Sequence, residues 1–400
     1  MLHLKARMNI GFATQTSLPL LRHLVANGER LPEDYQFAPS ADWVKELLRM
    51  GHNVTVFTTA AGVGEATTFR GNRLKIKVAN RRRKGTGRDF YAAERQQLTQ
   101  MMLEERCEII HAHWTYEYAL AALATGIPTL VTIHDLPWNV LRYFRDAHRA
   151  ARLVMAYEVA FRGKHFTAVS DDAAKHFRRY LKPGAKIAVA PNGLPDAIFE
   201  MGKGQLRAGQ ADVFTFATVL QGWTRRKNPT AALKAFAIVR RELPAARLLM
   251  FGLGYQVGGP AHDWAVQQNI ENGVTFAGVL PYMQLIKKLC EEVDVLVHPS
   301  VEESFSMAAL EGMALRKPVI AGRSTPGVRQ VLGFGEAGIL VDVRDPAALA
   351  EAMIQLARNP EYLTRVAESG YERASKLYRL EAVMTQYQEL YKRILGSSAC

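Results

Sequence analysis

Residues 293–322 read VDVLVHPSVEESFSMAALEGMALRKPVIAG, and this stretch decides the fold class. The stretch 293–297, apolar except for Asp294, predicts a buried strand ending at a Pro-Ser turn, and the small residues around Glu311 predict a helix. Val319 and Ile320 then predict a second strand. Strand, helix and strand make a βαβ unit, in which ligands bind beyond the carboxyl end of the strand, where the helix N-terminus attracts an anion.

Two glutamates, Glu303 and Glu311, flank that predicted anion site. If all nine residues from one to the other were helical, their side chains would lie about 80° apart around the axis and about 12 Å apart along it. At that separation they cannot share one proton or one metal ion. We therefore expect the two carboxylates to have separate functions.

Length and composition set broad limits. Four hundred residues, 48% of them apolar, favour two domains of roughly 200 residues each. The net charge of +13 and the pI of about 9.6 favour anionic partners such as nucleotide phosphates, lipid headgroups or nucleic acid. Cys107, Cys290 and Cys400 are too far apart in sequence to indicate a disulfide framework or a zinc site, so we expect a reducing compartment. Neither a signal peptide nor a membrane-spanning helix is expected.

The first half alternates strands and helices. A strand at 8–14 is followed by an irregular stretch at 15–39, then by a helix at 41–50 with Ser40 as its expected N-cap, and by a strand at 53–58. Further strands are predicted at 108–114, 128–135, 165–170 and in the run KIAVA at 186–190.

Two of these strands end in histidines, namely His111 and His113 in one and His134 in the other. A single histidine in a protein is commonly structural, but the end of a parallel strand is where a sheet presents side chains to ligand. We therefore treat His134 as a candidate ligand contact, with Asp135 orienting its ring or capping the next helix.

The second half repeats the pattern. A polar, glycine-bearing segment at 192–212 suggests a hinge. After it, strands at 213–219, 246–252 and 274–278 alternate with helices at 229–242 and 281–291 before the opening stretch. Two such series predict an α/β protein with two doubly wound domains facing across a cleft.

Residues 70–88 contain nine Arg or Lys and no acid. Because no aromatic residues are interleaved for base stacking, the stretch is a poor nucleic-acid platform, and a solvated loop is the simpler interpretation. The alternative is peripheral contact with anionic lipid or an acidic acceptor. The last helix, about 380–395, carries an apolar stripe and mixed outward charges, which favours packing on a core over lying on a membrane.

Together these motifs resemble the GT-B glycosyltransferases, and within them the retaining family numbered 4. The resemblance spans nearly the whole chain and depends most on ESFSMAALE at 303–311, in which two glutamates are separated by seven residues. Other matching stretches are GHNVTVFT at 51–58, HAHW at 111–114, TIHD at 132–135, PNG at 191–193, RRKN at 225–228 and LMFGLG at 249–254.

The resemblance implies roles for individual residues. Glu303 would contact hydroxyls of the donor sugar, and Glu311 would bind the ribose hydroxyls of the nucleotide. Lys227 would stabilise the leaving diphosphate, and His134 would orient hydroxyls or the acceptor. The N–H groups near Phe305, Ser306 and Met307 would face the diphosphate, and Arg226 and Gly254 complete the predicted nucleotide site.

Three positions depart from the family pattern. Gln221-Gly222 stands where an arginine is common, and Arg225, Arg226 and Arg323 are the candidates for the second cation. Pro39-Ser40-Ala41 replaces the usual glycine pair, and residues 327–330 read GVRQ where Gly-x-Pro-Glu is common. No function is assigned to the last two.

The resemblance implies a Rossmann-like acceptor domain at 1–195, a Rossmann-like donor domain at 196–376 and a C-terminal helix at 377–400 that returns to the first domain. The expected activity is retaining, metal-independent transfer from a UDP- or GDP-sugar to a carbohydrate or lipid-linked acceptor in polysaccharide, lipopolysaccharide or glycolipid biosynthesis. No cofactor and no nucleic-acid partner are expected, and the expected location is the cytoplasm, with membrane contact through 70–88 left open.

Other functions remain compatible with the sequence. A nucleotide-sugar epimerase of the same fold would turn over the donor without an acceptor. A phosphorylase would need a lysine site for pyridoxal phosphate, and none is recognisable. A non-catalytic two-domain sugar-binding protein would share the paired α/β domains and the hinge, and a nucleic-acid binder is supported by charge alone.

Overall fold

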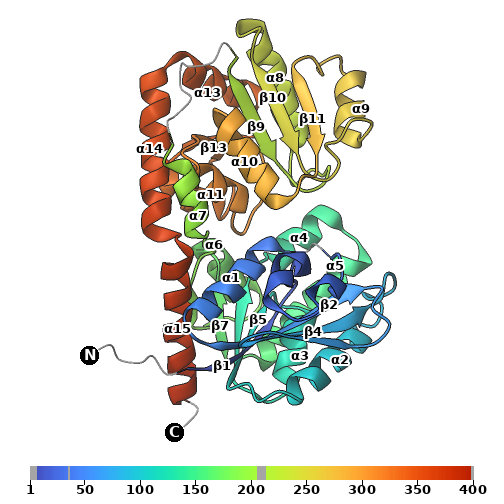
Figure 1. Cartoon of the computed structure of the whole chain (residues 1–400). Coiled ribbons are helices and arrows are strands. Elements are labelled where there is room, and N and C mark those ends of the chain that lie inside the picture. The colour runs from blue at the N-terminus through green and yellow to red at the C-terminus, as the bar shows by residue number, and fades with distance from the viewer. Residues whose placement is uncertain (1–6, 35–36, 205–212, 398–400) are drawn as a thin grey trace, which may run out of the picture. The chain divides into compact units, whose positions relative to one another are not determined.

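The computed structural model describes residues 7–34, 37–204 and 213–397. The chain forms two compact units. Unit 1 comprises Met1–Gly193 and Leu380–Cys400, and unit 2 comprises Leu194–Arg379. Each unit contains one largely parallel sheet covered by helices, so the predicted class of two doubly wound α/β domains is confirmed (Figure 1).

Unit 1 contains an eight-stranded sheet in the order β3-β4-β2-β1-β5-β6-β7-β8. The strands are β1 (Asn9–Ala13), β2 (Asn53–Ala61), β3 (Thr67–Arg70), β4 (Leu74–Arg81), β5 (Ile109–His113), β6 (Thr129–Ile133), β7 (His165–Ala168) and β8 (Ile187–Val189). All neighbours are parallel except β3 and β4. The chain order reverses between β1 and β5, so the carboxyl ends of these strands form the topological switch point of unit 1.

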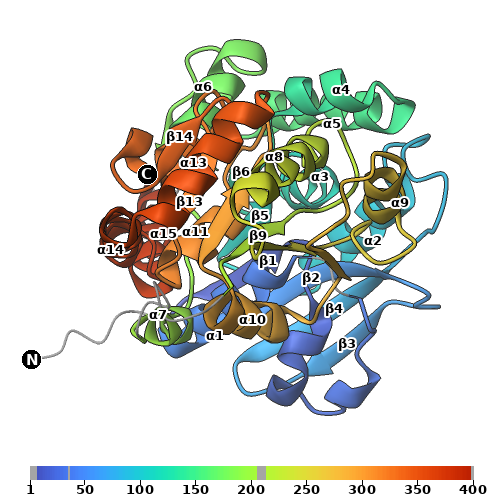
Figure 2. The same cartoon turned by 90° about the horizontal axis from the view of Figure 1, so that it is seen from above.

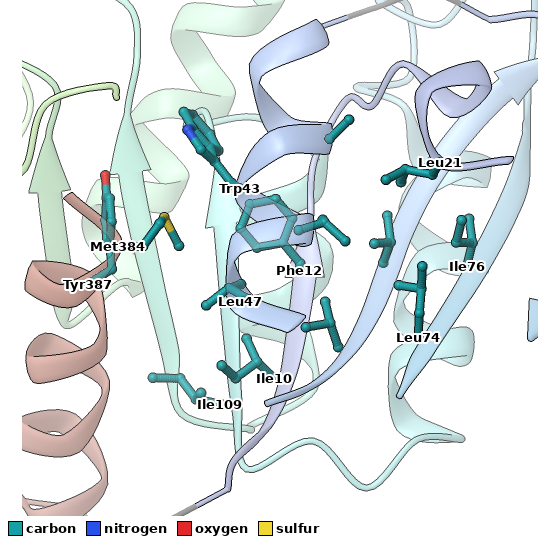
Figure 3. Close-up of a cluster of buried hydrophobic side chains, with 14 of the residues drawn as sticks. Ile10, Phe12, Leu21, Trp43, Leu47, Leu74, Ile76, Ile109, Met384 and Tyr387 are labelled. Atoms are coloured by element: carbon teal, nitrogen blue, oxygen red, sulfur yellow. The ribbon is translucent and has the colours of Figure 1, made fainter. Parts of the chain in front are cut away.

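The helical elements of unit 1 are η1 (Leu18–Leu24), η2 (Gly28–Arg30), α1 (Ala38–Arg49), α2 (Ala92–Leu103), α3 (Glu117–Ala124), α4 (Pro137–Phe144), α5 (Ala147–Arg162), α6 (Asp171–Tyr180) and α15 (Leu380–Ser397). Side chains from α1, β1, β4, β5 and α15 gather in one hydrophobic core (Figure 3). In α15, Val383, Met384, Tyr387 and Tyr391 are all buried there. The interpretation of the last helix as core-facing is therefore confirmed.

Two sequence predictions in unit 1 are wrong. Ser40 does not cap α1, because Pro39 fits the first turn and the helix already begins at Ala38. The Ser40 hydroxyl donates instead to the carbonyls of Phe37 (2.6 Å) and Gln15 (3.0 Å).

The stretch 70–88 is also not a simple loop. Strands β3 and β4 form an antiparallel hairpin, and β4 buries Leu74, Ile76 and Val78 between its basic residues. This alternation of period two is a strand pattern, and the high charge of the stretch obscured it.

Unit 2 contains a six-stranded, all-parallel sheet in the order β11-β10-β9-β12-β13-β14. The strands are β9 (Thr215–Val219), β10 (Arg247–Phe251), β11 (Val274–Gly278), β12 (Val295–His298), β13 (Val319–Gly322) and β14 (Ile339–Val341). The topological switch point of unit 2 lies between β9 and β12, whose carboxyl ends are adjacent.

The helical elements of unit 2 are α7 (Asp196–Gly202), α8 (Pro229–Glu242), α9 (Pro260–Gln267), α10 (Tyr282–Glu292), α11 (Met307–Ala314), α12 (Val328–Val331), η3 (Gly333–Gly335), α13 (Pro346–Arg358) and α14 (Pro360–Leu377). Figure 2 shows α8 beside α13, and both helices contribute to the main core of the unit. Helix α7 lies inside the predicted hinge segment 192–212, of which residues 205–212 are outside the described part. No helix in the described ranges is long and apolar enough to cross a bilayer.

Candidate functional site

Two loops meet at the switch point of unit 2. The loop after β9 carries Arg226 and Lys227, and the loop after β12 carries Glu302 and Glu303. The Val301 N–H donates to the Arg226 carbonyl (2.9 Å), which fixes one loop against the other. About 75 residues of sequence separate the two charged pairs. The pairs meet in space because β9 and β12 are neighbours in the sheet.

Lys227 and Glu303 form a buried ion pair. The Lys227 Nζ donates to Glu303 Oε1 at 2.5 Å, and the side chains are only 12% and 10% exposed. His298, at the end of β12, brings its Nε2 to 3.4 Å from the same carboxylate oxygen. Burial alone would raise the pKa of Glu303, but the Lys227 charge and the His298 hydrogen bond outweigh it and hold that pKa well below its usual range. Glu303 is therefore ionised across the physiological pH range.

A second ion pair lies in the same two loops. The Arg226 guanidinium donates to Glu302 Oε2 at 3.0 Å, and Glu302 is buried. Arg323, another candidate for the second cation, donates instead to the Leu340 carbonyl at 3.3 Å. Arg226 thus lies beside Lys227 with a fixed partner, which makes it a stronger candidate than Arg323 for the cation that Gln221 does not supply.

Helix α11 begins directly after the Glu303 loop. Ser306 is its N-cap, and the Ser306 Oγ accepts from the Ala309 N–H (3.2 Å) and lies 3.2 Å from His298 Nε2. By helix geometry the N–H groups of Met307 and Ala308 have no acceptor within α11. Phe305 packs its ring edge-on against Tyr378, with centroids 5.9 Å apart. The N-terminus of α11 therefore presents unpaired N–H groups directly after the loop whose Glu303 holds Lys227.

Glu311 lies on α11 and is 5% exposed. Its Oε1 accepts from the Tyr282 hydroxyl, which belongs to α10, at 3.1 Å. Burial raises the pKa of Glu311 to about 7, although the Tyr282 hydrogen bond lowers it somewhat. The two glutamates of the motif therefore differ in charge: Glu303 is ionised, and Glu311 titrates near neutrality.

Glycines shape the surrounding loops. Gly254, in the loop after β10, has φ +91° and donates its N–H to Gln256 Oε1 (3.2 Å). At Gly252 a Cβ would lie 1.7 Å from the Leu220 carbonyl oxygen, so only glycine lets the loops after β9 and β10 approach this closely.

Gly327 supports the Glu303 loop. Its φ is +72°, and a Cβ there would lie 2.3 Å from the Ser304 carbonyl oxygen. Sequence reasoning assigned nothing to residues 327–330, yet the backbone at Gly327 determines where the loop bearing Glu303 can lie.

The candidate residues of unit 1 form a different kind of site. At the carboxyl ends of β5 and β6, His113 Nδ1 and His134 Nε2 lie 2.8 Å apart. Trp43 stacks on His113 with centroids 4.8 Å apart. Within β5, His111 Nδ1 lies 2.7 Å from the Tyr391 hydroxyl of α15, and its Nε2 lies 2.6 Å from Thr132 Oγ1.

All three histidines are buried and neutral. Burial lowers the pKa of His134 to about 3 and the pKa values of His111 and His113 well below the usual range for histidine. His113 Nε2 is buried with no hydrogen-bond partner among the described residues. These imidazoles can accept or donate hydrogen bonds, but they do not carry charge at neutral pH.

Sequence reasoning missed three residues of the unit 2 site. His298 and Glu302 stood in the quoted stretch, and the strand-end position of His298 was a usable signal. Tyr282 gave no signal, because its contact with Glu311 depends on the packing of α10 against the same sheet. Within 7–34, 37–204 and 213–397 no cluster of three or more His, Cys, Asp or Glu could hold a metal ion.

The chain resembles known proteins over most of its length. It is 23% identical to N-acetyl-alpha-D-glucosaminyl L-malate synthase of Bacillus anthracis over 311 residues, covering 74% of this chain and 78% of that protein. Its fold matches sucrose-phosphate synthase of Thermosynechococcus elongatus with TM-score 0.78 and 18% identity, covering 98% and 100% of the two chains. It also matches Anabaena HepE in complex with UDP-glucose with TM-score 0.69 and 17% identity, covering 97% and 100%.

Two family descriptions match separate parts of the chain. Glycosyltransferase Family 4 matches residues 41–197, which lie largely in unit 1, and Glycosyl transferases group 1 matches residues 212–373 in unit 2. The two matched ranges thus cover most of both Rossmann-like units. The chain belongs to the GT-B glycosyltransferases of group 1 and family 4.

Proposed function

We propose that this enzyme transfers a sugar from a nucleotide diphosphate sugar, a UDP- or GDP-sugar, to a hydroxyl of a carbohydrate or lipid-linked acceptor with retention of anomeric configuration. The observation that carries the proposal is the buried Lys227–Glu303 ion pair beside the N-terminus of α11. Such a transfer belongs to polysaccharide, lipopolysaccharide or glycolipid biosynthesis.

The diphosphate binds at the start of α11. The N–H groups of Met307 and Ala308 point along the helix axis toward it, and the helix dipole adds partial positive charge. Lys227 and Arg226 bring two cations from the loop after β9, each held by a carboxylate of the loop after β12. As the bond to the sugar breaks, negative charge grows on the diphosphate, so these cations stabilise the transition state more than the bound donor.

Glu311 and Glu303 bind the two ends of the donor. The ionised Glu311 carboxylate accepts hydrogen bonds from the vicinal ribose hydroxyls, and its burial makes those bonds strong. Glu303 holds Lys227 through Oε1 and offers its second oxygen to donor-sugar hydroxyls. Gly254 permits close approach of the loop after β10 to the nucleotide.

Retention follows if the acceptor attacks from the face that the diphosphate leaves. The departing diphosphate oxygen then takes the proton of the incoming hydroxyl, and no protein nucleophile is required. His134, neutral and hydrogen-bonded to His113, orients hydroxyls rather than supplying charge. The charge of the diphosphate is met by Lys227, Arg226 and α11, so no metal ion is required.

UDP is the preferred nucleotide in this proposal. The Anabaena protein that matches the fold was solved with UDP-glucose, and an alpha,alpha-trehalose-phosphate synthase from Burkholderia vietnamiensis with the same fold is UDP-forming. These likenesses support UDP over GDP without identifying the sugar.

Calorimetry with UDP, GDP and their common sugar conjugates tests the donor. We expect one nucleotide series to bind the wild-type enzyme, and we expect Lys227→Ala and Glu311→Ala each to weaken that binding by about tenfold or more. Unchanged affinity for every nucleotide in both variants would refute the donor site. With the donor known, NMR of the product gives the anomeric configuration, and an inverted product would refute retention. Equal rates with and without EDTA are expected.

A further inference from the structure

Helix α5 has an apolar stripe on its outer face. One side of the helix, including Met155, Ala156 and Val159, is buried in unit 1. At spacings of three and four residues on another side lie Ala147, Ala150, Val154, Tyr157 and Phe161, all of them exposed. Phe161 is 88% exposed, the largest value among the exposed large hydrophobic side chains of the described residues. Such a stripe normally marks the face that a helix buries against a partner.

Helices α4 and α6 extend this apolar surface. In Figures 1 and 2, α4 lies next to α5. Trp138 of α4 donates its Nε1–H to the Tyr157 hydroxyl at 3.0 Å, and with Leu141 and Tyr180 these residues line an open groove of about 860 Å³. Of the six exposed aromatic side chains in the described part, four lie in this segment, namely Trp138, Tyr157, Phe161 and Tyr180. We call this the α4–α6 surface.

The α4–α6 surface is also basic. Arg142, Arg145 and Arg179 line the groove, and none of them pairs with a carboxylate among the described residues. Asp146 is the one acid in the groove lining, and it is engaged as the N-cap of α5 and by the Arg149 guanidinium at 3.0 Å. On α5 itself, Glu158 pairs with Arg162 at 2.7 Å. The guanidinium charges of the groove are thus free to meet anions.

The basic stretch 70–88 is organised differently. Lys75 pairs with Glu105, Lys77 with Glu104, Arg81 with Asp34, and Arg82 with both Asp89 and Glu94. Four of its nine basic side chains are therefore neutralised by carboxylates of the protein. Membrane contact through 70–88 stays a prediction. The α4–α6 surface differs from that stretch because it combines unpaired arginines with exposed aromatic rings.

We propose that the α4–α6 surface docks the enzyme on an anionic lipid bilayer. Tryptophan and tyrosine favour the interfacial region, phenylalanine inserts below it, and arginine pairs with lipid phosphates. A second copy of the chain is a poorer occupant, because a two-fold interface would bring the unpaired arginines of both copies together. The surface begins three residues after His134, so the bilayer would lie beside the carboxyl edge of the unit 1 sheet. The proposal does not depend on the identity of the donor.

Sedimentation with vesicles tests this. The full-length protein is mixed with vesicles of phosphatidylcholine alone or with phosphatidylglycerol added, and the bound fraction is measured. We expect binding only to the anionic vesicles, weakened about tenfold by Phe161→Ala and by about tenfold or more by Arg142→Gln with Arg145→Gln. Because these side chains are exposed, the variants should fold normally.

Two matched controls locate the binding face. Phe334→Ala removes another exposed ring, 67% exposed and in unit 2, and Arg83→Gln with Lys84→Gln removes the same charge from the 70–88 stretch. Both controls should bind like wild type. The proposal fails if anionic vesicles are not bound, if the α4–α6 variants bind normally, or if the Arg83 and Lys84 control alone loses binding. It also fails if light scattering finds a wild-type dimer that Phe161→Ala converts to a monomer.

Discussion

The two sheets of this enzyme present opposite chemistry at equivalent positions. At the switch point of unit 2, the loops that follow β9 and β12 carry the ion pairs Lys227–Glu303 and Arg226–Glu302. At the switch point of unit 1, strand β5 carries His111 and His113, which are buried and neutral, and His134 lies beside them. The same parallel topology thus supports a charged edge in one unit and an uncharged, hydrogen-bonding edge in the other.

The difference shows which partner each edge suits. A fixed cation beside a helix N-terminus suits a group that gains negative charge during reaction, because its stabilisation grows as the bond breaks. A neutral imidazole pair suits hydroxyls, which need orientation more than charge. Variants that exchange or remove these properties, taken below from the largest expected effect to the smallest, test whether the contrast is functional.

Lys227→Met should have the largest effect. Without the ammonium the developing diphosphate charge loses its nearest cation, and kcat/KM should fall by about 10²–10³-fold. The change also leaves Glu303 buried without its main partner, which should cost about 3–5 kcal/mol of unfolding free energy. Steady-state kinetics and chemical denaturation measure the two effects.

The double variant Lys227→Met with Glu303→Gln separates catalysis from folding. It removes both charges, so we expect most of the stability to return while the activity stays low. Activity that recovers together with stability would mean that the lysine has only a structural role.

Glu311→Gln should weaken donor binding about tenfold and remove its pH dependence. With a pKa of about 7, the wild-type carboxylate ionises as the pH rises from 6 to 8, so wild-type affinity for a UDP-sugar should rise over this range. Calorimetry at both pH values checks this, and the same pH dependence in the variant would contradict the assignment.

The free energy of unfolding should change in the opposite direction to donor affinity, falling as the pH rises. A carboxyl whose pKa is raised from 4.5 to about 7 on folding stabilises the fold at low pH, and that contribution is lost as the pH rises through 7. Glu311→Gln removes the loss, so at pH 8 the variant should be more stable than wild type by ~3 kcal/mol.

His134→Gln should lower kcat by about 3–10-fold, because a hydrogen-bonding group is misplaced but no charge is lost. Since the pKa of His134 is about 3, the wild-type and variant pH–rate profiles should have the same shape between pH 5 and 8. His165→Gln, at the start of β7 and so at the other edge of the sheet, is the control and should leave kcat unchanged. If the wild-type rate falls at acidic pH and this fall is absent from His134→Gln, His134 titrates in catalysis.

Ser306→Ala should have the smallest effect. Loss of the N-cap of α11 should cost about 1 kcal/mol of stability and weaken donor binding a few-fold. Ser170→Ala removes the equivalent cap of α6 in unit 1, where the Ser170 Oγ accepts from the Ala173 N–H at 3.1 Å. Ser170→Ala should lose similar stability without changing donor affinity. If Ser170→Ala weakens donor binding as much as Ser306→Ala does, the α11 cap has no specific role in the donor site.

The sequence predicted the features that local patterns encode. The βαβ unit at 293–322 and the core-facing stripe of α15 both follow from periodicity and turn chemistry. Helix α8 was predicted at its observed bounds, because Pro229 begins it and apolar residues recur through it. These signals lie within a few residues of the structure they specify.

Features made by distant segments could not be predicted in the same way. The partners of the basic residues in 70–88 include Asp34, Glu104 and Glu105, which come from other elements. The bond from Tyr282 to Glu311 and the close contact of Gly327 with Ser304 likewise depend on tertiary packing. Short helices such as α7 and α9 were missed, because seven or eight residues show too little periodicity.

Helix α15 bears on how the protein is made. During synthesis β1 and β5 emerge early, but the side chains that cover them, among them Tyr391 with its bond to His111, come from the end of the chain. At about 5–20 residues per second, translation of unit 2 delays them on the order of ten seconds or more. Unit 2 can fold while the chain is still on the ribosome, whereas unit 1 keeps an open apolar face until α15 has been translated. A nascent chain halted before residue 380 should therefore carry one native domain and one binding site for chaperones.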